Sequence, residues 1–226
     1  MARFTCGYPF WANPRFSKFF QDWLRIRLVP ILLVLIFTDP SAFEQYLAPV
    51  GGEVRSRPMI GSHFRADIDI RPLPRVGLFK VEADSFAAEK APRGEFYSLN
   101  IPLNVPFTVS DIGNEQTFGG SSAYMLSPNR PMNFQCKRKC HALACNFYVS
   151  TVKAYRERMQ QEATTGQMLL EPRISLMTAT GSRLFRAVTR AWTALGMDDS
   201  IISEIARREM EDDLLASFMS LAQDSW

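Results

Sequence analysis

Residues 64–70 read Phe-Arg-Ala-Asp-Ile-Asp-Ile, and in this stretch apolar and charged side chains alternate strictly. Successive side chains of a β-strand point to opposite faces, so the pattern predicts a strand with one buried and one solvated face. Short strands that recur at nearly regular spacing predict an antiparallel β-barrel or sandwich. Further strands are predicted at 76–81, 97–103, 107–109, 123–126, 132–136 and 142–147.

A helical period replaces this pattern after Ser150. Apolar residues then recur every three or four positions, which predicts three helices, the first over 151–161 and the last behind an N-cap at 198–200. The tight connection at Gly196 indicates that the last two helices form a hairpin. Asp39 followed by Pro40 predicts one more short helix. We therefore expect an α+β fold, a β-barrel or sandwich followed by a C-terminal helical hairpin.

The beginning of the chain contains an apolar run that could be mistaken for a membrane segment. Residues 28–37 form this run, but its ten residues are too few to span a bilayer, which takes ~20. Arg25 and Arg27 precede it, yet no small-x-small cleavage site follows. We expect a buried strand in a cytoplasmic protein with no membrane partner. Export through residues 25–37 is the alternative.

The composition argues against several classes of protein. Of 226 residues, 46% are hydrophobic and 22% are charged, which is ordinary for a globular protein and excludes disordered and fibrous chains. The net charge of +3 is too small to indicate nucleic-acid binding by itself. The predicted helix 200–222 carries five acidic residues against two arginines, so DNA phosphates would repel it. We therefore expect no direct contact with nucleic acid.

Residues that could carry catalysis are scarce. The chain has two histidines, His63 and His141, whereas a metal enzyme built on such a barrel needs two or three with a carboxylate. No Gly-x-Ser-x-Gly elbow and no phosphate-binding glycine loop is present. We expect no catalytic residue, no cofactor and no enzymatic activity. A cupin-type enzyme acting on a small molecule is the alternative.

The densest group of metal-ligand residue types is Cys136, Cys140, His141 and Cys145. Zinc accepts Cys3His sets, but structural zinc motifs pair their ligands on tight knuckles with a second pair well removed. Here Cys136 and Cys145 fall in opposite arms of a predicted hairpin, where cysteine packs as a small apolar side chain. We expect core packing and no metal, with a zinc site as the alternative.

Several of these pieces, in this order, resemble the N-terminal sensor domain of AraC-type transcription regulators, in the group described as AraC-binding-like. The resemblance rests on residues 37–50 and 97–103. It rests above all on Gly119-Gly-Ser-Ser-Ala-Tyr-Met-Leu-Ser-Pro-Asn-Arg-Pro131, which is similar to the family's glycine turn and the strand ending after it. The resemblance covers roughly 33–222. It implies a cupin-like barrel that holds a small effector, and C-terminal helices that pair two subunits.

On this basis we expect an aromatic-rich N-terminal arm at 1–30, a cupin-like barrel sensor domain at 31–150 and a helical tail with dimerisation helices at 151–226. Under the resemblance, the ligand-binding residues would be Tyr97, Leu99, Phe107, Tyr124 and Phe134. The dimer contacts would be Leu184, Val188, Trp192, Leu214, Phe218 and Leu221. The competing interpretation is that the first set fills a dry core and the second packs on its own barrel.

Two helix-turn-helix units normally follow such a domain in this family, whereas this sequence ends at Trp226. We therefore expect a ligand-sensing and dimerisation module of an AraC-type regulator without its own DNA-binding region. Its partners would be a small-molecule effector and either a second copy or a full-length regulator in a mixed dimer. A truncated fragment without function is a further alternative.

Overall fold

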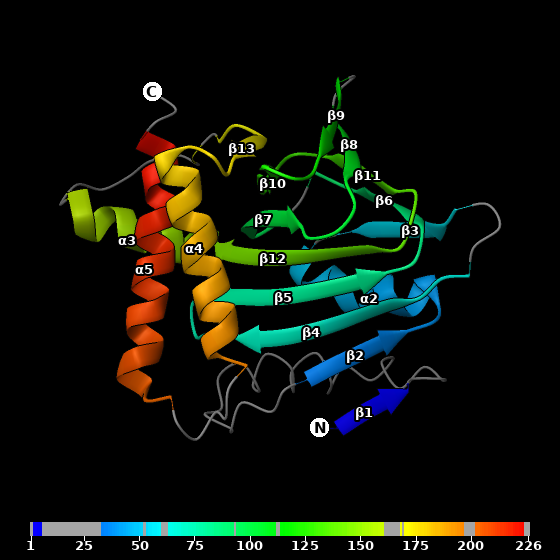
Figure 1. Cartoon of the computed structure of the whole chain (residues 1–226), viewed down its shortest axis with the longest axis horizontal. Coiled ribbons are helices and arrows are strands. Elements are labelled where there is room, and N and C mark those ends of the chain that lie inside the picture. The colour runs from blue at the N-terminus through cyan, green and yellow to red at the C-terminus, as the bar shows by residue number, and fades with distance from the viewer. Residues whose placement is uncertain are drawn as a thin grey trace.

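Two β-sheets face each other, and four helices lie around them, in the described part of the chain (Figure 1). The structure is a computed structural model. It describes residues 2–5, 33–51, 53–59, 63–92, 94–111, 114–160, 168, 170–196 and 202–223.

The larger sheet has eight strands in the order β1-β2-β4-β5-β12-β7-β10-β13. Neighbouring strands run antiparallel, except that β1 is parallel to β2. The strands are β1 (Ala2–Thr5), β2 (Leu33–Phe37), β4 (Ala66–Pro72), β5 (Val76–Ala83), β7 (Phe96–Pro102), β10 (Ser122–Leu126), β12 (Cys140–Tyr148) and β13 (Arg173–Ser175).

The smaller sheet has five antiparallel strands in the order β3-β6-β11-β8-β9. The chain crosses from one sheet to the other between β5 and β6 and again between β11 and β12, so the two sheets close into a barrel. The strands are β3 (Val54–Pro58), β6 (Phe86–Lys90), β8 (Phe107–Asp111), β9 (Asn114–Phe118) and β11 (Met132–Cys136).

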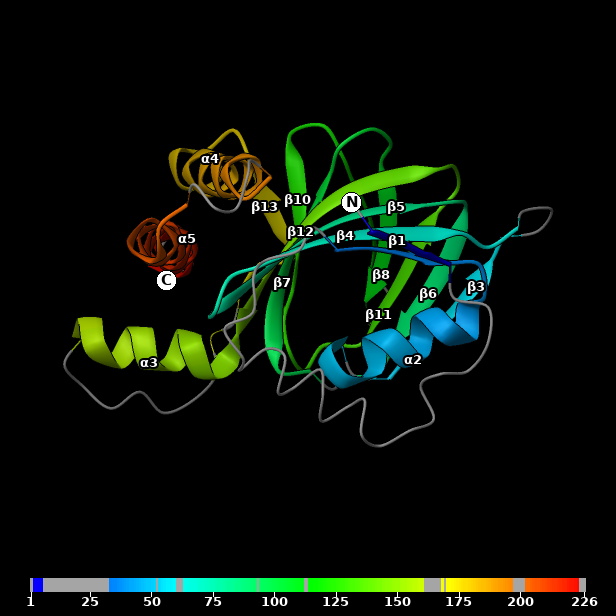
Figure 2. The same cartoon turned by 90° about the horizontal axis from the view of Figure 1, so that it is seen from below.

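The helices are α2 (Pro40–Gly51), α3 (Val149–Gln160), α4 (Ala179–Ala194) and α5 (Glu204–Gln223). Figure 2 shows α3, α4 and α5 together on one side of the barrel and α2 apart from them against its strands. The predicted start of α2 is confirmed, since Ser41 N donates to Asp39 Oδ1 over 3.0 Å. None of the described helices is both long and apolar enough to cross a membrane.

Side chains along the strands of the larger sheet alternate between its two faces, so the sheet contributes to two separate hydrophobic cores. Its outer face packs under α4 and α5, and this helix-side core includes Leu78, Leu99, Phe147, Leu184 and Phe218. The space between the sheets holds the barrel core, which includes Phe43, Phe86, Phe107, Phe118 and Tyr124. Strand β10 serves both cores, because Ala123 and Met125 face the helices while Tyr124 and Leu126 face the barrel.

The expected α+β fold, a barrel followed by a helical hairpin, is confirmed, with two differences of detail. The helical tail contains a strand, β13, which pairs with β10. The last helix begins at Glu204, and Ser203 Oγ accepts from Ala206 N over 3.1 Å; the cap expected at 198–200 lies outside the described residues. Of the apolar run 28–37, the structure describes Leu33–Phe37, which is a strand as predicted.

Candidate functional site

The five side chains expected to line a ligand site are divided between the two cores. Phe107, Tyr124 and Phe134 lie in or against the barrel core. Tyr97 and Leu99 lie in the helix-side core, on the opposite face of the sheet. The hydroxyl of Tyr97 accepts from Met168 N over 2.9 Å and donates to Met168 O over 3.2 Å. Tyr97 therefore holds the segment before β13, and neither Tyr97 nor Leu99 shares a site with the other three.

Aromatic rings line most of the barrel interior. The ring of Phe107 lies 4.8 Å from that of Phe134 and 5.9 Å from that of Phe118, measured between centroids. Phe118 in turn lies 5.1 Å from Tyr124. Helix α2 closes one side of the interior with Phe43, whose ring is 5.5 Å from that of Phe64. Such an interior suits an apolar or aromatic molecule.

Polar groups gather at one end of this interior. Asp111, at the end of β8, follows the inward-facing Phe107 and Val109 at the strand's period of two. Its Oδ2 lies 3.6 Å from Arg130 Nη1. Its Oδ1 is buried and has no hydrogen-bond partner within the described residues. Burial raises the pKa of the Tyr124 hydroxyl, Asp111 adds to that increase and Arg130 opposes it.

Lys90 lies at the same end of the smaller sheet, since the register pairs Lys90 with Met132 and Asn133 with Ser110. Its side chain is 6% exposed, and Nζ donates to Ala91 O over 3.1 Å. Burial lowers the pKa of this amine, because a charged group loses its hydration there. The interior therefore has a polar end and an aromatic remainder, the combination that orients a bound small molecule. Asp111 and Lys90 were not among the predicted site residues.

The side chains expected at a dimer interface are mostly buried within the chain itself. Leu184, Val188, Leu214 and Phe218 are fully buried in the helix-side core, and Leu221 is 7% exposed. Trp192 is partly buried against the same core, with the guanidinium of Arg71 3.8 Å from its ring centroid. This corrects the expected interface, because the apolar stripe covers the larger sheet and is not presented to a second subunit.

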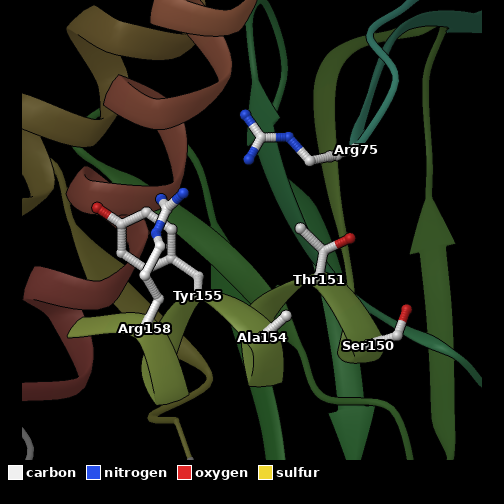
Figure 3. A pocket seen from close by; sticks show the side chains of 6 residues that line it. All are labelled: Arg75, Ser150, Thr151, Ala154, Tyr155 and Arg158. Atoms are coloured by element: carbon white, nitrogen blue, oxygen red, sulfur yellow. The ribbon is translucent and has the colours of Figure 1, made fainter. Parts of the chain in front are cut away.

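A hollow of about 370 Å³ opens between α3 and Arg75, just before β5 (Figure 3). Its two guanidinium groups already bind carboxylates of α5. Arg75 Nε lies 2.8 Å from Glu211 Oε2, and Arg158 Nη2 lies 3.5 Å from Asp212. The hollow is therefore a junction that holds α5, and the barrel interior is the better candidate site. Its lining residues are Arg75, Ser150, Thr151, Ala154, Tyr155 and Arg158.

The four residues weighed as zinc ligands point to different places. Cys136 and Cys140 lie in the barrel core, whereas Cys145 is in the helix-side core. His141 Nε2 lies 3.7 Å from Glu82 Oε2. Across the described ranges, no three metal-ligand side chains come together.

Comparison with known proteins finds one family model and several solved structures that are similar to this chain. The model of a family described as AraC-binding-like domain matches residues 41–220. The crystal structure of the AraC-like transcriptional activator CuxR superposes with a TM-score of 0.62 at 11% identity, covering 85% of this chain and 70% of that one.

Two further solved structures match over less than half of this chain. The EutQ protein of Clostridium difficile has a TM-score of 0.34 at 6% identity, over 46% of this chain and 74% of that one. A cupin superfamily protein of Desulfitobacterium hafniense has a TM-score of 0.30 at 13% identity, over 42% and 78%. A search of curated protein sequences finds no match. Because the family model spans most of the chain, including its C-terminal helices, the chain belongs to the AraC-binding-like domain family.

Proposed function

We propose that the chain is the ligand-sensing and pairing part of an AraC-type regulator, and that its effector binds inside the barrel. The family is one of regulatory sensor domains. The observation that supports a ligand most directly is Asp111 Oδ1, a buried acceptor without a hydrogen-bond partner in the described residues. Buried polar atoms are rarely left unpaired, since that costs about 1–3 kcal/mol. The effector would carry a hydrogen-bond donor for Asp111 and an apolar body for the aromatic rings.

Strand β10 is the proposed route from this site to the helices. Tyr124 faces the interior, and its neighbour Met125 faces the helix-side core. Strand β13 pairs with β10 through Ser122 and Ser175, and α4 begins four residues later. The first turn of α4 lies so close to the end of β13 that a Cβ at Gly181 would be 2.0 Å from Ser175 O. A shift of β10 would therefore move α4 with it.

Pairing would use the outer faces of the two long helices, because their apolar stripe is already covered. Arg183, Arg186 and Arg190 form an exposed ridge on α4, and Glu204 and Glu209 are exposed on α5. Glu204 pairs with Arg208 and Arg190 with Asp213 inside the chain, so contact with a second copy would fall to Arg183, Arg186 and Glu209, whose opposite charges favour pairing. The same acidic surface makes α5 a poor DNA reader, since a recognition helix must approach phosphates. We infer a homodimer, or a mixed dimer with a full-length regulator. In this proposal the chain does not itself bind DNA and has no enzymatic activity.

The effector site is tested by a thermal-shift screen against small molecules that combine a ring or alkyl body with an amine, hydroxyl or amide donor. Compounds that raise the unfolding midpoint of the wild type should lose most of that effect in Asp111→Leu. Glu115→Leu, at an exposed position on the neighbouring strand β9, is the matched control and should keep the full shift. A shift that persists in Asp111→Leu, or disappears equally in both variants, contradicts a site in the barrel.

Light scattering tests the pairing proposal, and a DNA-retention assay tests the proposal that the chain does not bind DNA. The wild type should give about twice the chain mass of 25.7 kDa. Arg186→Glu should move the population toward monomer, whereas Lys153→Glu on the exposed side of α3 should not. None of the three should retain duplexes from a random-sequence pool at physiological salt. A monomeric wild type would contradict the pairing proposal. Retention of DNA by the wild type would contradict the proposal that the chain does not bind DNA.

A further inference from the structure

Two thiols lie at the corner where the two sheets join. Cys136 is the last residue of β11 and pairs with Phe86 of the smaller sheet. Cys140 is the first residue of β12 and pairs with Ala83 of the larger sheet. Only the turn 137–139 separates them, and both side chains enter the barrel core, 0% and 4% exposed. The fold thus brings one cysteine from each sheet to a single corner.

The two sulfur atoms interact directly. The thiol of Cys140 hydrogen-bonds to the Cys136 sulfur, and this bond lowers the pKa of Cys136 to about 7. The same bond, with burial, raises the pKa of Cys140. One thiol is therefore poised as a thiolate nucleophile beside a second that can resolve it, which is the arrangement of a redox-active pair.

The turn between the thiols is the route by which an oxidant reaches them. Lys137, Arg138 and Lys139 are all exposed. Cys136 Sγ donates to the carbonyl oxygen of Arg138 over 3.1 Å, so the sulfur lies against the backbone of this turn. Access to the buried sulfur would therefore need only a local displacement of this exposed turn.

We propose that Cys136 and Cys140 are a reversible oxidative modification site, at which a peroxide converts the two thiols into an intrachain disulfide. The Cys136 thiolate attacks one oxygen of hydrogen peroxide, the O–O bond breaks, and hydroxide leaves as a sulfenic acid forms. The Cys140 sulfur then attacks the sulfenic sulfur, and the Cys140 proton leaves with the sulfenic oxygen as water; the proton that Cys136 lost on ionising neutralises the hydroxide. Two thiols and one peroxide thus give one disulfide and two waters. A thiol reductant reverses the reaction.

The third described cysteine provides an internal control. Cys145 lies on the same strand as Cys140 but faces the helix-side core, and it is completely buried. Burial raises the pKa of its thiol well above the ordinary range. It should therefore stay reduced under conditions that oxidise the corner pair. The modification is independent of the proposed effector, because it needs only the chain and peroxide.

To test the proposal, the purified chain is treated with a small excess of hydrogen peroxide. The remaining thiols are then blocked with an alkylating reagent under denaturing conditions, and the chain is digested with trypsin. Trypsin cuts within Lys137–Lys139, so the disulfide appears as two joined peptides about 2 Da lighter than the separate thiol peptides. We expect this species in wild type and in Cys145→Ser, its loss on reduction, and full alkylation of Cys145 in the wild type. Cys140→Ser should instead give a sulfenic acid on Cys136 that dimedone traps.

Two results would overturn the proposal. The first is a wild-type chain whose corner thiols both remain alkylatable after peroxide treatment, or are oxidised no faster than Cys145. The second is irreversible addition of oxygen to Cys136 in the wild type without any joined peptide. Both are read on the wild-type chain, so they do not depend on how well a variant folds.

Discussion

Replacing Phe218 with alanine is expected to lower the free energy of unfolding by about 3–5 kcal/mol, because the change leaves a cavity that the surrounding side chains fill only partly. The Phe218 ring is fully buried, with its centroid 4.3 Å from that of Phe147 and 5.4 Å from that of Tyr97. Urea denaturation followed by circular dichroism measures the loss. Ile205→Ala is the control, since Ile205 is on the same helix but 71% exposed, and it should change stability by no more than about 0.5 kcal/mol.

The concentration dependence of that loss separates two interpretations of the apolar stripe on α4 and α5. If Phe218 packs within its own chain, the destabilisation is the same at every protein concentration. If the stripe were a subunit interface, the variant would instead lose mainly the concentration-dependent part of its stability. A Phe218→Ala chain as stable as Ile205→Ala would contradict the helix-side core.

Glu211→Ala is expected to destabilise the chain by about 3 kcal/mol, the lower end of the range for breaking a buried ion pair, because its partner is partly solvated. The Glu211 side chain is 1% exposed and that of Arg75 is 33% exposed. Glu211 also accepts the backbone N–H of Arg75 over 2.5 Å, so its removal leaves that donor without this acceptor. The loss should appear in the same urea titrations.

Asp213→Ala is the matched control for Glu211→Ala. Asp213 is on the same helix and pairs with Arg190, whose side chain is 69% exposed. Exposed pairs contribute about 0–1 kcal/mol, since water screens both charges. Equal effects of the two substitutions would show that Glu211 does not hold α5 to the start of β5.

The sequence predicted the strands that are rich in apolar residues and missed those that are polar or very short. The alternation at 64–70 predicted β4, and the alternation of Met132, Phe134 and Cys136 predicted β11. Strand β9, Asn114–Phe118, is polar along most of its length and lacks an apolar alternation. Strand β13 has three residues and forms only because β10 is beside it. Pairing of this kind depends on tertiary contacts that a local pattern does not contain.

The candidate site was predicted only in part, for a related reason. Strand β7 is buried on both faces, so the period of two shows that Tyr97 and Leu99 share a face but not which face is the barrel interior. Asp111 opens the β8–β9 hairpin. It faces inward because it lies two residues after Val109 and four after Phe107, and the local pattern does not show which face of β8 becomes the interior of the barrel. Lys90 ends a strand that the pattern did not predict.

Calorimetric titration of the most stabilising compound from the thermal-shift screen tests the central claim most directly, because two tyrosines mark the two faces of the larger sheet. Tyr124→Phe removes a hydroxyl from the barrel interior, and Tyr97→Phe removes one from the helix side. Tyr124→Phe removes one hydrogen-bonding hydroxyl from the interior, so it should weaken binding three- to tenfold, that is by about 0.7–1.4 kcal/mol. Tyr97→Phe should leave the affinity unchanged. Weaker binding in Tyr97→Phe with unchanged binding in Tyr124→Phe would place the ligand outside the barrel and contradict the account.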